Sequence, residues 1–216
     1  PYDGGIGDRK IIEAVRRGDV SEEILDKAVE RILKTVFKAV KNRKEGFKYD
    51  KEAHHKLARE VARECFVLLK NDDNILPLKA EGTIAIIGAF AKTPRYQGRG
   101  SSHVNPTMLD NAYDEILRIV GNKAKVFYAE GYRLTDEIVD ETLIEEAKRV
   151  AKSADVAIVF IGLPEWYESE GYDRPHMKLP ESHNKLVEEV SKVQKNVIVV
   201  LSNGAPVEMP WVSNVK

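Results

Sequence analysis

Residues 155–161 read Asp155-Val156-Ala157-Ile158-Val159-Phe160-Ile161, an aspartate followed by an unbroken apolar run. Such a run is typical of a strand that is buried on both faces of a parallel sheet. The next residues, 162–174, form a polar stretch rich in glycines, aromatics and carboxylates, and a helical pattern resumes after Pro180. Open α/β sheets bind ligands at the carboxyl ends of their strands, so this loop is the first candidate for a functional site.

The same alternation of strand and helix patterns extends on both sides of this stretch. Strands are predicted over 83–88, 125–129, 155–161 and 196–201, and helices over 108–120, 138–152 and 181–193. A turn at 203–206 ends the last strand. Alternating strands and helices predict an α/β fold with a mainly parallel sheet and helices on both faces, that is, an α/β sandwich.

Before Thr83 the pattern is helical. One helix is predicted to begin at Ser21 and to end by Gly46, with an apolar stripe formed by Leu25, Ala28, Val29, Ile32, Leu33 and Val36. A second helix is predicted from about Lys51 to Lys70, with Cys65 as a small buried side chain on its apolar face. The predicted organisation is an N-terminal element over 1–45, a linker with a helix over 46–82, and an α/β domain over 83–216. Both ends look cut, so we expect a fragment of a longer chain.

Composition excludes several classes of function. A net charge of -1 and a pI near 6.7 give no electrostatic case for binding nucleic acid or an anionic membrane. No segment is long and apolar enough to cross a bilayer. A single cysteine excludes an internal disulfide and, with no visible signal sequence, favours a cytoplasmic location. The histidines lack the spacing of zinc ligands, so no metal or other cofactor is predicted.

Two polar loops are candidates for chemistry. The first holds several carboxylates, among them Glu168 and Glu170, although an ordinary solvated loop would look much the same. Trp166 and Tyr167 beside them suit stacking on a sugar ring, or packing. The second loop, 95–106, contains Gly98-Arg99-Gly100, which is not the dinucleotide fingerprint, because His103 stands at the third glycine position. Its polar groups predict either hydroxyl binding or a plain surface loop.

Four motifs stand in order along the chain, at 11–33, 55–78, 94–102 and 168–174. Together they resemble glycoside hydrolase family 3, the family of many β-glucosidases, over essentially the whole chain. The first motif resembles the end of that family's (β/α)8 barrel domain, and the second its interdomain segment. The last two resemble loops of its α/β sandwich domain.

The resemblance implies a retaining mechanism with two carboxylates. It places the nucleophile, an aspartate, on a barrel domain outside this chain, and the general acid/base at Glu170, with Glu168 as the alternative. In an extended loop the two glutamates would point opposite ways. An acid at this position needs a pKa raised toward neutral. The resemblance also implies a serine contact to the sugar, best matched by Ser101, with Ser102 beside it.

The resulting hypothesis is a fragment of a retaining β-glucosidase that acts on terminal β-linked glucose in glucosides or oligosaccharides and is inactive without its barrel domain. Arg99 leaves the preference for the leaving group open. A non-catalytic α/β module that binds a ligand or a partner is an alternative, and so is the same family with another substrate, such as β-xylosides. The apolar surface that would face the barrel is expected to be exposed, or covered by a second copy of the chain in a homo-oligomer.

Overall fold

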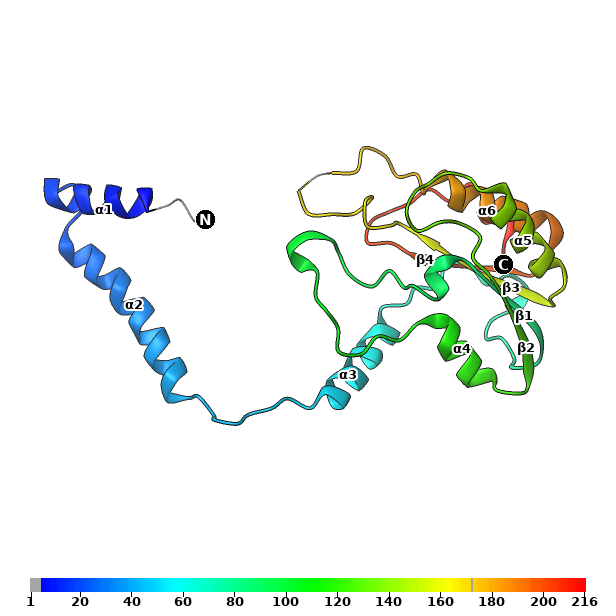
Figure 1. Cartoon of the computed structure of the whole chain (residues 1–216), viewed down its shortest axis with the longest axis horizontal. Helices are drawn as coiled ribbons and strands as arrows, with labels where there is room; N and C mark the ends of the chain where they lie inside the picture. Colours follow the sequence, from blue (N-terminus) through cyan, green and yellow to red (C-terminus); the bar gives the residue numbers. More distant parts are fainter. Residues whose placement is uncertain (1–4, 172) are drawn as a thin grey trace. The chain divides into compact units, whose positions relative to one another are not determined.

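The structure is a computed structural model that describes residues 5–171 and 173–216. Residues 1–4, and Tyr172 in the polar stretch 162–174, lie outside the described residues. The chain divides into two units, Pro1–His54 and His55–Lys216. Figure 1 shows the order of the elements along the chain. None of the helices in the described ranges combines the length and apolar character of a membrane span.

The first unit contains helices α1 (Ile6–Arg17) and α2 (Glu22–Lys41), and neither has a buried residue. Gly18, with φ 80°, ends α1 in the left-handed conformation that glycine adopts most readily. The apolar stripe predicted for α2 is exposed, from 37 % at Leu25 to 65 % at Ile32. The exposure of the surface that would face a barrel domain stays a prediction.

Helix α3 (Lys51–Glu64) ends before the predicted limit at Lys70. The residues after it leave the helix because they are held elsewhere: the Lys70 ammonium donates to the carbonyls of Val212 and Val215 near the end of the chain. Cys65 consequently lies outside the helix and is exposed, so the prediction of a buried cysteine was wrong. A short 3-10 turn, η1 (Asp72–Asn74), follows.

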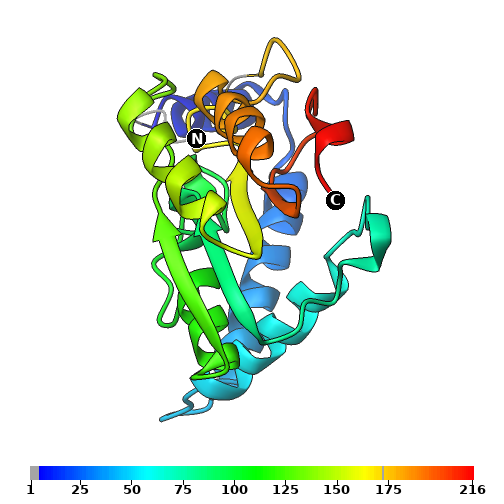
Figure 2. The ribbon, with the colours of Figure 1, turned by 90° about the vertical axis from the view of Figure 1, so that its right-hand side faces the viewer.

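The second unit is built on a four-stranded sheet. Its strands are β1 (Gly82–Ile87), β2 (Ala124–Ala129), β3 (Val156–Gly162) and β4 (Val197–Ser202). They run in the order β2-β1-β3-β4, and every neighbouring pair is parallel. Figure 2 shows neighbouring strands of this sheet side by side. The predicted parallel sheet is confirmed, and each strand lies within one residue of its predicted limits.

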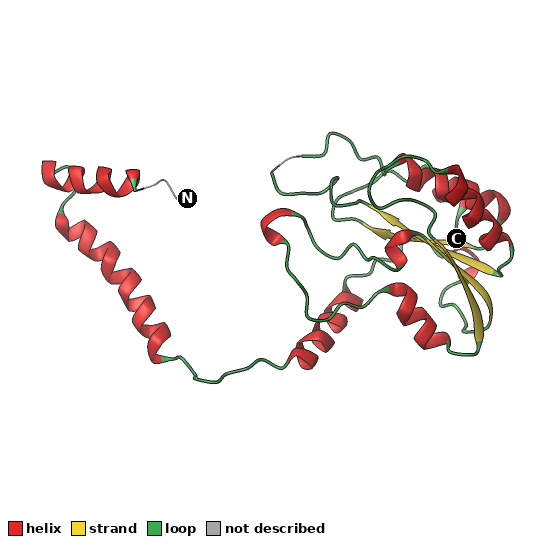
Figure 3. Cartoon of the chain, in the orientation of Figure 1, coloured by secondary structure: helices red, strands yellow, loops and turns green. Residues whose placement is uncertain are grey.

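Helices cover both faces of the sheet, as expected for an α/β sandwich (Figure 3). Helices α5 (Glu141–Lys152) and α6 (Glu181–Val193) pack together on one face, and α4 (Ala112–Val120) lies on the other. Tyr113 of α4 packs on Tyr128 of β2, with 5.3 Å between ring centroids. Helices α4 and α5 begin later than predicted because Asn111 and Asp140 act as N-caps: the Asn111 side chain accepts one backbone N–H and the Asp140 carboxylate accepts two.

The core is centred on β3, in which all seven residues are buried. At its carboxyl end a single side chain joins β3 to the turn that follows β1. The buried Tyr132 hydroxyl donates to the carbonyl of Phe160 at 2.9 Å and accepts the N–H of Phe90 at 3.1 Å. Phe90 lies in η2 (Ala89–Ala91), the turn that follows β1. The loops that leave β1 and β3 therefore start from a rigid base.

Candidate active site

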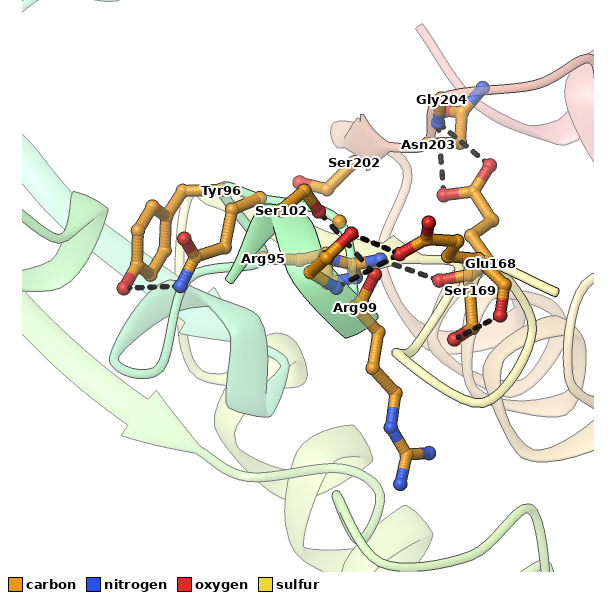
Figure 4. A pocket seen from close by; sticks show the side chains of 13 residues that line it. Arg95, Tyr96, Arg99, Ser102, Glu168, Ser169, Ser202, Asn203 and Gly204 are labelled. Carbon is orange, nitrogen blue, oxygen red and sulfur yellow. Dashed lines mark hydrogen bonds between the residues drawn. The ribbon is translucent and has the colours of Figure 1, made fainter. Parts of the chain in front are cut away.

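A pocket of about 710 Å³ lies beyond the carboxyl ends of β3 and β4 (Figure 4). Three segments line it: residues 95–99, 101 and 102 from the loop after β1, residues 168–170 from the loop after β3, and residues 202–204 at the end of β4. The first segment includes the short turn η3 (Gly100–Ser102). The two polar loops singled out in the sequence therefore meet at one pocket, together with the turn after β4.

Glu170 is exposed at this pocket and is held by Ser101. Its Oε2 atom accepts the backbone N–H of Ser101 at 2.9 Å and also the Ser101 hydroxyl. Gly100 makes this approach possible because it adopts φ +85°, and a Cβ there would lie 2.9 Å from the same oxygen. The backbone of η3 can therefore come close to the carboxylate.

The pKa of Glu170 is lowered from its usual value. The Ser101 hydroxyl is the main cause and the Ser101 N–H the second, because both stabilise the ionised carboxylate, while burial opposes them only weakly. A general acid needs a pKa raised toward neutral, whereas the pKa of Glu170 in this chain by itself is lowered; a raised pKa in the assembled site stays a prediction. The physical reason for the lowered pKa is that the carboxylate is open to solvent and bonded to two donors. Near neutral pH it is ionised, which is the form of a base.

Glu168 has different partners. Both of its carboxylate oxygens accept the N–H of Gly204, at 3.0 and 3.1 Å, and Figure 4 shows its side chain pointing toward that residue. A Cβ at Gly204 would lie 3.2 Å from the carboxylate, so a larger residue would crowd it. Glu168 thus ties the β3 loop to the end of β4, while Glu170 is tied to η3. Of the two, Glu170 is the more exposed.

The two candidate sugar-binding serines lie in η3. Ser101 uses its hydroxyl proton on Glu170, but its oxygen keeps lone pairs that can accept a hydrogen bond from a sugar hydroxyl. Ser102 donates weakly to the carbonyl of Arg99, at 3.4 Å. Both line the pocket.

Trp166 and Tyr167 do not line this pocket. Tyr167 is half-buried, its hydroxyl donates to the carboxylate of Glu137, and its ring lies 6.0 Å from that of His176. Burial, followed by the bond to Glu137, raises the pKa of Tyr167 to about 12. For Tyr167 the contacts therefore fit the packing alternative. Trp166 is also half-buried, and stacking of either ring on a sugar stays a prediction.

Several pocket residues were not selected from the sequence. Arg95 donates from Nε to the carbonyl of Leu163 at 3.2 Å and from Nη2 to the carbonyl of Glu168 at 3.3 Å. Asn203 and Gly204 line the pocket, although their stretch was treated only as a turn. The pattern of strands could have indicated Asn203 and Gly204. The carboxyl ends of neighbouring parallel strands meet at one edge of a sheet, so the loop after β4 is expected beside the loop after β3.

Comparison with known proteins decides the family. The family model described as glycosyl hydrolase family 3 C-terminal domain matches residues 66–216. The chain belongs to glycoside hydrolase family 3. The resemblance recognised in the motifs is thereby confirmed, and the pocket lies in the part of the chain that this family's C-terminal domain covers.

Family 3 relatives match the chain over its full length. It is 59 % identical over 216 residues to a protein named thermostable beta-glucosidase B from Acetivibrio thermocellus, covering 100 % of this chain and 29 % of that protein. It is 40 % identical over 220 residues to an exo-alpha-(1->6)-L-arabinopyranosidase of Bifidobacterium breve, covering 97 % of this chain and 29 % of the relative. The chain therefore spans less than a third of the length of these relatives.

A solved family 3 structure has the same fold. The beta-glucosidase of Bifidobacterium adolescentis superposes with a TM-score of 0.88 at 42 % identity, over 97 % of this chain and 31 % of that chain. This likeness agrees with the parallel sheet and the helices on its two faces. Among the described residues no group of three or more His, Cys, Asp or Glu side chains could hold a metal ion.

Proposed function

We propose that this chain supplies the general acid/base of a retaining β-glucosidase and that Glu170 is that residue. One observation carries the proposal: an exposed carboxylate, fixed by two donors, lies at the pocket beyond the carboxyl ends of the sheet. Family membership supplies the class of chemistry. Glu168 is less suited because the N–H of Gly204 already binds both of its oxygens.

In the proposed reaction Glu170 acts twice. It first gives a proton to the glycosidic oxygen while a nucleophilic carboxylate attacks the anomeric carbon and the leaving group departs. It then takes a proton from the water that attacks the glycosyl-enzyme, which releases the sugar with retained configuration. The nucleophile is expected on the family's barrel domain, about 5 Å from Glu170 in the assembled site.

The first of these steps needs a protonated carboxyl group, whereas the pKa of Glu170 is lowered in this chain. Assembly with the barrel and a bound sugar would exclude water from Glu170 and bring the negative nucleophile close, and both changes raise the pKa of a carboxyl group. Ser101 opposes this rise and favours the ionised form. Because these effects oppose each other, Glu170 can carry a proton in the first step and lose it readily, so that it acts as a base in the second.

The proposed substrate is a terminal β-linked glucoside, because the relative with 59 % identity is named a beta-glucosidase. A second candidate substrate is a glycoside of another sugar, hydrolysed by the same proposed catalytic residues. It is favoured by the relatives with 40 % identity that are named exo-alpha-(1->6)-L-arabinopyranosidases. A non-catalytic binding module would retain ligand binding without needing the carboxylate of Glu170.

The test compares Glu170→Ala with Glu168→Ala in the full-length protein that contains this chain. Glycosides with poor leaving groups need protonation, so Glu170→Ala should lose about 10²–10⁴-fold in their kcat/KM and much less with activated aryl glycosides. Glu168→Ala is the matched control and should show no such dependence on the leaving group. The reverse pattern would move the acid/base to Glu168. Full activity in both variants would refute a catalytic role for this loop.

A further inference from the structure

Arg95 holds the acid/base loop at two points. Its side chain comes from the loop after η2, is half-buried and lines the pocket. The Nε atom donates to the carbonyl of Leu163, the first residue after β3, and Nη2 donates to the carbonyl of Glu168. A rigid planar guanidinium can make both bonds at once, which a lysine ammonium at this place cannot reproduce.

The bonds of Arg95 join others that restrain the same segment. The N–H of Leu163 donates to the carbonyl of Ser202 at 3.0 Å, which ties the start of the loop to β4. Farther along, the carboxylate of Glu168 accepts the N–H of Gly204. Only Arg95 reaches both ends of residues 163–168 among the described residues, and it approaches them from the same loop that carries Ser101, the partner of Glu170.

We infer that Arg95 is a positioning residue for the reaction: its guanidinium fixes the backbone of residues 163–168 so that the Glu170 carboxylate is held at the pocket. This inference rests on the proposed function of Glu170. Within the described ranges Arg95 forms no ion pair, so its bonding is directed at the two carbonyls. Its loss removes two restraints from the loop and leaves the chemistry of the carboxylate unchanged.

Arg99 offers a matched control. It lines the same pocket and carries the same charge, but its side chain extends away from the other labelled residues in Figure 4. Among the described residues its side chain makes no hydrogen bond or ion pair. Replacing Arg99 therefore changes the charge of the pocket by the same amount without releasing the loop.

The test uses the full-length protein and the variants Arg95→Met, Arg95→Lys and Arg99→Met, with Glu170→Ala as reference. The readout is the ratio of kcat/KM for an activated aryl glycoside to that for a glycoside with a poor leaving group. Because both substrates are measured on one preparation, the ratio does not depend on the fraction of enzyme that is folded. A displacement of a catalytic group by about 1 Å costs on the order of 10²-fold, and this loss should fall on the acid-dependent substrate.

Arg95→Met should raise the ratio toward that of Glu170→Ala, Arg95→Lys should raise it less, and Arg99→Met, which leaves both bonds to the loop in place, should change it less than Arg95→Met does. An unchanged ratio in Arg95→Met would refute the inference. An equal rise in Arg99→Met would also refute it, because the loss of a positive charge from the pocket would then be enough to change the ratio. If Glu170→Ala itself leaves the ratio unchanged, the proposed function fails, and that outcome is distinct from a failure at Arg95.

Discussion

The buried residue His183 should make the α/β domain less stable as the pH falls. Its side chain is 2 % exposed, its Nδ1 lies 2.9 Å from the carbonyl of Gly162 at the end of β3, and its ring lies 3.9 Å from that of Tyr132. Burial among these groups lowers the pKa of His183 from 6.5 to about 4, and the bond to Gly162 opposes the change only in part. The folded domain therefore holds this imidazole neutral.

Stability falls as the pH falls because the unfolded chain binds protons that the folded chain does not. Between about pH 6.5 and pH 4 the unfolded chain protonates this histidine and the folded chain does not, so the unfolded state binds more protons. The contribution of neutral His183 to the free energy of unfolding is complete above pH 6.5 and is lost as the pH falls to about 4. At about 1.4 kcal/mol per pKa unit, the gap between 6.5 and about 4 corresponds to roughly 3 kcal/mol.

Urea unfolding of the chain, followed by circular dichroism, gives the free energy of unfolding at pH 7.5 and at pH 4. His183→Asn keeps a donor near the position of Nδ1 and does not titrate. Its loss of stability between the two pH values should be smaller than that of the wild type by about 3 kcal/mol. His103→Asn, at an exposed histidine, is the control and should behave as the wild type. An equal pH dependence in wild type and His183→Asn would refute the argument.

Three further predictions concern the site and its support. Tyr132→Phe removes two buried hydrogen bonds and should lower the free energy of unfolding by about 1–3 kcal/mol in urea titrations. Tyr113→Phe, for which the described residues show no hydroxyl bond, should change it little, and equal losses would contradict this role. Ser101→Ala removes the main cause of the lowered pKa of Glu170, so an NMR titration of that carboxyl should give a higher pKa than in the wild type. An unchanged or lower value would mean that the hydroxyl is not the cause. The chain alone should not hydrolyse aryl β-glucosides, because the nucleophile is expected on the barrel domain, and turnover by pure chain that disappears in Glu170→Ala would overturn this.

The sheet could be predicted from the sequence because its strands carry strong local patterns. Residues 156–161 are apolar without interruption, and in the fold they form a strand that is buried along its whole length. Helix limits were less predictable. Helix α3 ends at Glu64 although its apolar spacing continues, because bonds from Lys70 to the far end of the chain outweigh helical propensity. Those contacts join residues distant in sequence.

The site was predictable as a place and less so in its chemistry. Both polar loops follow strands, and strand ends of a parallel sheet share one edge, so their meeting could be foreseen. The sequence could not give the hydrogen-bond partners of Glu168 and Glu170, since Gly204 and Ser101 lie far along the chain from them. For the same reason the lowered pKa of Glu170 was missed, and so was the role of Arg95 as a link between loops.

The most direct test of the central claim is azide rescue in the full-length protein. In Glu170→Ala an activated aryl β-glucoside should form the glycosyl-enzyme and then stall, because no base activates water. Azide needs no base, so it should restore turnover and release the β-glycosyl azide, with retained configuration. Glu168→Ala should show no rescue. Rescue in Glu168→Ala and none in Glu170→Ala would contradict the assignment of Glu170 as the acid/base.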